Sequence, residues 1–317
     1  MHFDLESHII YEVISGSHAY GFATPDSDYD YRGIAIPPEK TVLGFAYPFD
    51  QFESKDPDRT IYNIQKFCKL ASDANPNVIE LLWIPEKLII KNSTWGELLR
   101  ENRDIFLSKK IKFTFSGYAI AQLKRIQTHK RWLLNPPKVQ PARKEYGLPE
   151  TSTTGAAIKS VLQAAESKGI EIDFLFSPEM ADLARKERAF FNAQKEWENY
   201  ESWKKNRNPA RAEIEAKYGY DCKHAVHLLR LLRMCKEILS TGEVLVERPD
   251  AEELRAIRTG SWSYEKLIEW AEQQDQEMNE LYEKSLLPRT ADIEKINDLC
   301  VNLIKDFQIQ RRRSGST

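Results

Sequence analysis

The chain has 317 residues, of which 41% are hydrophobic, and its formal net charge is −2. This length is enough for a full hydrophobic core and for one catalytic domain with a further extension. The near-neutral charge excludes a protein that binds nucleic acid through its overall charge, so any nucleic-acid surface has to be local.

Cysteine spacing and hydropathy exclude further classes of protein. The four cysteines, Cys68, Cys222, Cys235 and Cys300, form no CxxC pair, which argues against a disulfide framework or a zinc ribbon. No apolar run is long enough to span a bilayer, and the N-terminus lacks a signal-peptide pattern. We therefore expect a cytoplasmic protein without a membrane partner.

The first predicted element is a buried strand over Ile9–Ile14, whose residues are mostly β-branched and apolar. The small residues Ser15, Gly16 and Ser17 break this strand. Glycine lets a backbone approach a phosphate closely, and the amides and hydroxyl around Ser17 could donate hydrogen bonds to it if a short helix begins at His18. Gly16 and Ser17 are therefore candidate phosphate ligands.

Two aspartates follow a predicted turn over residues 23–27 and precede a second predicted strand over residues 31–36. A strand points residues two apart to the same face, so Asp28 and Asp30 would present paired carboxylates to one point. Such a pair repels itself unless a cation lies between the carboxylates. Mg²⁺ suits this place because it takes oxygen ligands and usually holds substrate phosphates as well.

A Gly-Ser pair followed about a dozen residues later by Asp-x-Asp resembles the signature of the DNA polymerase beta-like nucleotidyltransferase superfamily. The chain is most similar to the RNA repair pathway DNA polymerase beta family, the RNA-ligase-associated polymerases. Residues 61–83 resemble this family too, as a strand that runs into a helix. The resemblance implies an α+β fold, in which a small mixed-sheet nucleotidyltransferase core is followed by a mainly α-helical C-terminal region.

The resemblance also implies a third carboxylate on a later strand. Asp58, just before the predicted strand residues 60–62, is the most natural candidate, and Glu53 and Asp56 are rivals. Two Mg²⁺ ions, with Mn²⁺ as a substitute, would then be held by Asp28, Asp30 and Asp58. Gly16 and Ser17 would hold the β and γ phosphates of a nucleoside triphosphate.

From about residue 108 onward, the sequence consists of long, charged segments whose apolar residues recur with the period of a helix. We expect a catalytic domain over 1–107, a helical nucleotide- and acceptor-binding region over 108–310 and a disordered tail over 311–317. Within the helical region, residues 134–154 carry four prolines and predict a mobile connection. Residues 182–205 predict a long helix that buries one stripe.

Two predicted helices carry polar stripes. Over residues 118–133 one face holds Tyr118, Gln122, Arg125, His129 and Trp132, which fits either a wet face with aromatic packing or a cleft wall that stacks on a base.

The second predicted helix, over residues 218–239, also resembles the family. Lys223, His227 and Arg230 share one edge of it, and Lys and Arg suit triphosphate binding. We expect these three residues to contact the nucleotide, whereas His224 lies near the apolar arc. The basic segment 203–211 and residues 257–260 resemble the family as well; the basic segment fits a solvated face as well as a nucleic-acid contact.

The resemblance implies a nucleotidyltransferase that adds a nucleoside monophosphate to the 3′ end of a broken RNA, with tRNA as one candidate, in functional association with an RNA ligase. Two alternatives stay open. One is AMP transfer to a protein or a small molecule, and the other is a non-catalytic RNA-binding or antitoxin-like module.

Overall fold

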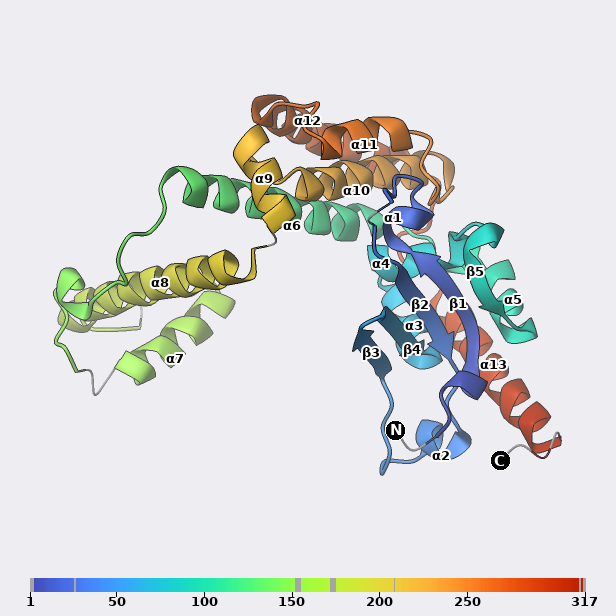
Figure 1. Ribbon diagram of the computed structural model, residues 1–317. Helices are drawn as coiled ribbons and strands as arrows, with labels where there is room; N and C mark the ends of the chain where they lie inside the picture. The colour runs from blue at the N-terminus through green and yellow to red at the C-terminus, as the bar shows by residue number, and fades with distance from the viewer. Residues whose placement is uncertain are drawn as a thin grey trace. The chain divides into compact units, whose positions relative to one another are not determined.

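The computed structural model describes residues 3–25, 27–151, 155–171, 175–207, 209–313 and 315. These form two compact units (Figure 1): a first unit of residues 1–126 with 221–317, and a second unit of residues 127–220. This division differs from the boundary expected after residue 107. The reason is that helices beyond that point bury apolar residues in the first unit, as the fully buried Ile111 and Phe115 illustrate.

The first unit contains a five-stranded mixed sheet of order β3-β4-β2-β1-β5. Strands β2 and β4 pair in parallel, and the other neighbours pair antiparallel. The strands are β1 (Ile9–Ser15), β2 (Asp30–Ala35), β3 (Gln51–Lys55), β4 (Asp58–Asn63) and β5 (Ile89–Asn92). A mixed sheet followed by mainly helical structure confirms the predicted α+β class.

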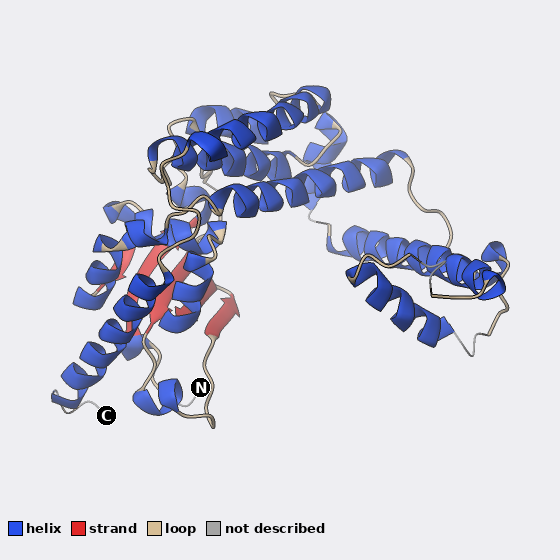
Figure 2. Ribbon diagram, turned by 180° about the vertical axis from the view of Figure 1, so that it is seen from behind, coloured by secondary structure: helices blue, strands red, loops and turns tan. Residues whose placement is uncertain are grey.

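The core of this unit lies between the sheet and the helices on one of its faces, the face turned to the viewer in Figure 2. Tyr11 and Ile34, which pair across β1 and β2, are buried on this face. The helices that pack there are α3 (Ile64–Ser72), α5 (Thr94–Glu101) and α13 (Ile293–Arg313). Ile61 belongs to a separate buried cluster with Leu5, Ile9 and Ala35.

Helix α13 continues through residues 311–313, which we expected to belong to a disordered tail. Arg311 donates a hydrogen bond to the Ser7 carbonyl at 2.9 Å, and Arg312 pairs with Glu39. Arginines in the last turn also interact favourably with the helix dipole. These contacts explain the longer helix; residues 314, 316 and 317 lie outside the described residues.

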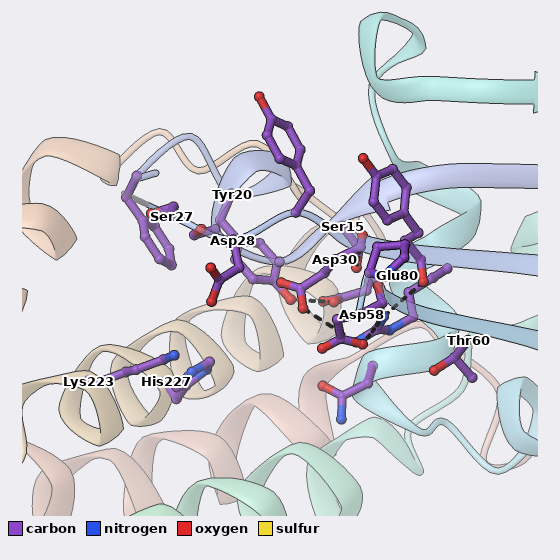
Figure 3. Close-up of a pocket in the computed structure, with 18 of the residues that line it drawn as sticks. Ser15, Tyr20, Ser27, Asp28, Asp30, Asp58, Thr60, Glu80, Lys223 and His227 are labelled. Atoms are coloured by element: carbon purple, nitrogen blue, oxygen red, sulfur yellow. Dashed lines mark hydrogen bonds and ion pairs between the residues drawn. The ribbon is translucent and has the colours of Figure 1, made fainter. Parts of the chain in front are cut away.

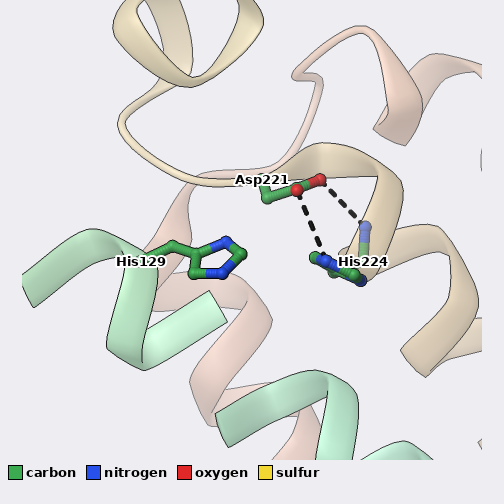
Figure 4. Close-up of side chains that lie close together, drawn as sticks. All are labelled: His129, Asp221 and His224. Carbon is green, nitrogen blue, oxygen red and sulfur yellow. Dashed lines mark hydrogen bonds and ion pairs between the residues drawn. The ribbon is translucent and has the colours of Figure 1, made fainter. Parts of the chain in front are cut away.

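Shorter helices and a C-terminal helical layer complete the first unit. These are α1 (Gly16–Ala19), α2 (Glu39–Leu43), α4 (Pro76–Ile79), α10 (Cys222–Thr241), α11 (Ala251–Arg258) and α12 (Tyr264–Lys284). Helix α10 packs against α11 and α12. Asp221 caps α10 by accepting hydrogen bonds from the amides of Lys223 and His224, and its carboxylate lies 3.5 Å from the His224 ring (Figure 4).

The second unit is helical. Helix α6 (Ile111–Leu134) begins in the first unit and ends in the second, which also contains α7 (Gly155–Ser167), α8 (Pro178–Asn206) and α9 (Pro209–Tyr218). Helix α8 contains the long helix predicted over residues 182–205, and it packs on α7 through Ala184. None of the helices in the described ranges is long and apolar enough to cross a membrane.

The connection predicted as mobile, residues 134–154, carries a short 3₁₀ turn at Arg143–Tyr146. Arg143 donates to the buried carboxylate of Glu187 on α8 at 3.0 Å, which ties this turn to the long helix. Residues 152–154 of the connection, and Asn208 in the basic segment 203–211, lie outside the described residues.

Candidate active site

A cavity of about 1060 Å³ opens in the first unit, at the end of the sheet where β1 stops and β2 and β4 begin (Figure 3). The loop after β1 forms one part of its lining, the strand starts form another, and helix α10 forms a third. Segments that are far apart in the sequence thus contribute polar side chains to one space.

Gly16 and Ser17, the predicted phosphate ligands, lie in the short turn of α1 directly after β1 and line the cavity. Gly16 has a φ of +66°, and a Cβ atom added there would lie 1.9 Å from Oδ2 of Asp30. A residue with a side chain would therefore be strained and would also collide with the carboxylate. Glycine is required here because the loop passes directly beside an acid.

The cavity brings the three predicted acids together, since Asp28, Asp30 and Asp58 all line it. Asp30 is the first residue of β2, and it is the direct partner of Asp58 in the parallel pairing with β4. Asp28 lies in the loop before β2, so the expected strand alternation begins only at Asp30. Of the two rivals for the third acid, Asp56 lines the cavity and Glu53 lies outside its lining.

Arg32 contacts two of these acids. Its Nη1 donates to Oδ1 of Asp58 at 2.9 Å, and its Nη2 lies 3.4 Å from Oδ1 of Asp30. Burial raises the pKa of Asp30, Arg32 opposes this rise, and the adjacent Asp58 adds to it. Clustered carboxylate oxygens whose ionisation is costly are a donor set that fits a hard divalent cation such as Mg²⁺.

Known proteins share part of this sequence. Residues 2–140 match the sequence profile of the RNA repair pathway DNA polymerase beta family. This part of the chain is therefore similar to that family. Its members are polymerase-beta-like nucleotidyltransferases connected with RNA repair, which generally use divalent metals.

Two curated proteins are similar to the chain. An uncharacterized 38.9 kDa protein from the nrdC-mobD intergenic region of Enterobacteria phage T4 is 30% identical over 34% of this chain and 35% of its own length. The uncharacterized protein YcgL of Bacillus subtilis (strain 168) is 31% identical over 30% of this chain and 37% of its own length. The chain thus spans about a third of each of these relatives. No solved structure matches it.

The polymerase-beta-like part supplies the acids, whereas the opposite wall of the cavity comes from beyond residue 140. Lys223, His227 and Arg230, predicted to share one edge of a helix, all line the cavity from α10. Figure 3 shows Lys223 and His227 on this helix, across from the loop that carries Asp28. The sequence stripe was therefore a correct guide to which residues share this wall.

Arg230 is tied into the wall more tightly than its two neighbours on the stripe. Its side chain is 2% exposed, and Nη1 donates to Oε2 of Glu80 at 2.9 Å. Glu80 also accepts a hydrogen bond from the hydroxyl of Tyr20, and the Arg230 guanidinium lies 3.9 Å from the centre of the Tyr20 ring. Because Tyr20 directly follows α1, this buried network supports the loop that carries Gly16 and Ser17.

Several residues of the cavity lining were not predicted as site residues, among them Tyr20, Arg32, Glu80 and Arg258. Arg32 continues the alternation of Asp28 and Asp30, so the strand period could have found it. Arg258 belongs to the segment 257–260 that resembled the family, and it lies in the last turn of α11. Nothing local in the sequence marks Tyr20 or Glu80, because their contacts join positions 60 and 150 residues apart.

The polar face predicted on residues 118–133 is not part of the cavity lining described here. The Tyr118 hydroxyl accepts from Asn75 at 3.1 Å, and the side chain of Gln122 lies 2.7 Å from Nδ1 of His224. In the second unit, His129 and Trp132 lie against Trp203. Aromatic and polar packing accounts for these contacts.

Proposed function

We propose that the protein is a metal-dependent nucleotidyltransferase that transfers a nucleoside monophosphate from a nucleoside triphosphate to the 3′-hydroxyl of an RNA. The observation that carries this proposal is the convergence of Asp28, Asp30 and Asp58 with the Gly16–Ser17 turn in one cavity. The family match over residues 2–140 supports the same reaction class.

The three carboxylates would hold two Mg²⁺ ions, which supply charge neutralisation and acidify the attacking hydroxyl. The turn at Gly16 and Ser17 would bind the β and γ phosphates through backbone amides and the serine hydroxyl. Asp58 would stand beside the acceptor hydroxyl, since it pairs with Asp30 at the start of the neighbouring strand. Attack at the α-phosphorus joins the nucleoside monophosphate to the acceptor oxygen, and the bond to pyrophosphate breaks.

Cations on the wall opposite the acids would balance the charge that develops on pyrophosphate. Lys223 and His227 line the cavity from α10, and Arg258 lines it from the end of α11. Arg258 forms no ion pair with any residue in the described part of the first unit. Arg230 lines the same wall, but its contact with Glu80 makes it a support of the phosphate turn as well.

The acceptor in this proposal is a broken RNA, with tRNA as one candidate, which an RNA ligase would then seal. The description of the family as part of RNA repair supports an RNA acceptor. The cytoplasm is the compartment that fits such a substrate.

The proposal is tested by incubating the full chain with Mg²⁺, each nucleoside triphosphate labelled at the α-phosphate, and RNAs with different 3′ ends. We expect label to enter RNA that has a 3′-hydroxyl, and pyrophosphate to be released in equal amount. If label appeared only on protein, the acceptor would be a protein and not an RNA. Absence of transfer to any acceptor would overturn the proposal in favour of a binding module.

A further inference from the structure

We propose that Arg32 is a built-in counter-ion that occupies the acidic site before metal binds and competes with the metal for the same carboxylate oxygens. This inference deepens the proposed function, because it depends on the metal site assigned above. It concerns a residue of this chain whose role is independent of which acceptor the enzyme uses.

The contacts of Arg32 single it out among the arginines of the sheet. Its Nη1 donates to Oδ1 of Asp58 at 2.9 Å, and its Nη2 lies 3.4 Å from Oδ1 of Asp30. These are oxygens that a divalent cation between Asp30 and Asp58 would use. The guanidinium is therefore placed where it neutralises part of the charge that would otherwise drive the two strand starts apart.

Backbone contacts hold this guanidinium in place. Nη1 also donates to the carbonyl oxygens of Tyr31, at 2.8 Å, and of Asp58, at 3.3 Å. The Arg32 side chain is only 21% exposed, so its charge is poorly screened by water. Arg32 consequently remains near the acids even when a metal takes their oxygens, and its charge opposes the charge of the metal.

Two consequences follow from a fixed cation beside a metal site. Arg32 stabilises the metal-free protein, because two ionised carboxylates in one partly buried place would otherwise repel each other. Arg32 also weakens metal binding, since the metal has to replace one favourable ion pair and accept a like charge nearby. Removal of its charge should therefore lower the stability of the metal-free protein and raise the affinity for metal.

Arg59 is the matched control. It lies on β4 next to Asp58, and its Nε donates to Glu12 at 2.6 Å while Nη1 contacts Glu6 at 2.5 Å. Both of these acids are outside the cavity lining. An Arg59→Gln variant thus removes an arginine with two carboxylate partners from the same sheet without touching the candidate metal ligands.

The experiment measures Mn²⁺ binding to the full chain without nucleotide, from the electron paramagnetic resonance signal of free Mn²⁺. We expect Arg32→Gln to lower the dissociation constant about tenfold, from the loss of a nearby like charge, and Arg59→Gln to leave it unchanged. Arg32→Lys, which keeps the charge, should remain close to the wild type. Equal or weaker Mn²⁺ binding by Arg32→Gln would overturn the inference.

Thermal unfolding gives a second readout on the same proteins. Arg32→Gln should unfold at a lower temperature than the wild type in EDTA and should regain more stability than the wild type when Mn²⁺ is added. Arg59→Gln should lose stability to the same extent in both conditions. If the wild type bound no Mn²⁺, the metal site and the proposed function would both fail. If the wild type bound Mn²⁺ and the Arg32→Gln variant bound it with the same affinity, only the role of Arg32 would be removed.

Discussion

Arg230 on α10 donates a hydrogen bond from Nη1 to Oε2 of Glu80 at 2.9 Å, and the two side chains are 2% and 3% exposed. This ion pair joins a helix beyond residue 220 to the polymerase-beta-like part of the chain. The backbone amide of Arg248 and a guanidinium nitrogen of Arg255 also donate, to the carbonyls of Tyr20 and Gly21. The C-terminal segment of the first unit is thus part of the framework that holds the turn at Gly16 and Ser17.

The first prediction concerns the buried pair of Arg230 and Glu80. An Arg230→Met variant leaves the Glu80 carboxylate buried without its cation, so the free energy of unfolding should fall by about 3–5 kcal/mol. Urea unfolding measures this change. Lys87→Met, which removes the exposed partner of Glu247, is the control and should change stability by less than about 1 kcal/mol. Equal losses in both variants would show that burial of the pair has no energetic consequence.

The second prediction separates the rivals for the third carboxylate. Because Asp58 is the strand partner of Asp30, Asp58→Asn should reduce the rate of nucleotidyl transfer by at least about 100-fold. Loss of a residue that only orients a metal ligand costs at most about that much, and loss of a metal ligand itself should cost more. Glu53→Gln should retain wild-type activity, and Asp56→Asn should retain most of it. Initial transfer rates at saturating Mg²⁺ provide the measurement. A large loss in Asp56→Asn with an active Asp58→Asn would exchange their roles.

The third prediction tests the close approach at Gly16. Gly16→Ala should reduce transfer sharply, because the new Cβ would lie 1.9 Å from Oδ2 of Asp30 and would displace either the turn or the carboxylate. Gly169→Ala is the matched control, since Gly169 also has a positive φ, +65°, but no atom within 4 Å of an added Cβ. It should cost about 1 kcal/mol of stability from backbone strain and should not alter the transfer rate. Equal activity of the two variants would contradict the close packing at Gly16.

The fourth prediction is a pH dependence of stability. Burial lowers the pKa of His8, although its hydrogen bond to the Asp4 carbonyl opposes this effect. The unfolded state then binds more protons than the folded state below about pH 7, so His8 makes stability fall as the pH drops toward 5. His8→Asn should show a weaker decline in the free energy of unfolding between pH 8 and pH 5, measured in urea. Parallel declines in both proteins would remove His8 as a cause.

The strands and the acidic motif could be predicted because local rules determine them. β-Branched runs bounded by small residues and prolines marked β1 and β2. The short helix considered from His18 begins earlier, at Gly16. The apolar period of residues 218–239 placed Lys223, His227 and Arg230 on one wall. Asp28 differs from expectation, since β2 begins only at Asp30.

Contacts between distant segments could not be predicted in the same way. Glu80 lies within an apolar stretch, and only the folded chain brings it to Arg230, 150 residues later. Likewise, the boundary expected after residue 107 followed the change in composition, whereas the compact units follow packing. Helices α10 and α11 belong to the first unit, because their side chains complete its core and line its cavity.

The most direct test of the central claim compares the wild type with an Asp28→Asn, Asp30→Asn double variant on one RNA that ends in a 3′-hydroxyl. Mass spectrometry of the RNA after incubation with Mg²⁺ and a nucleoside triphosphate reads the product. We expect RNA extended by a whole nucleoside monophosphate with the wild type, and unchanged RNA with the double variant. Circular dichroism verifies that the double variant is folded. Equal extension by both proteins, or unchanged RNA with the wild type and every nucleotide, would contradict nucleotidyl transfer at this acidic site.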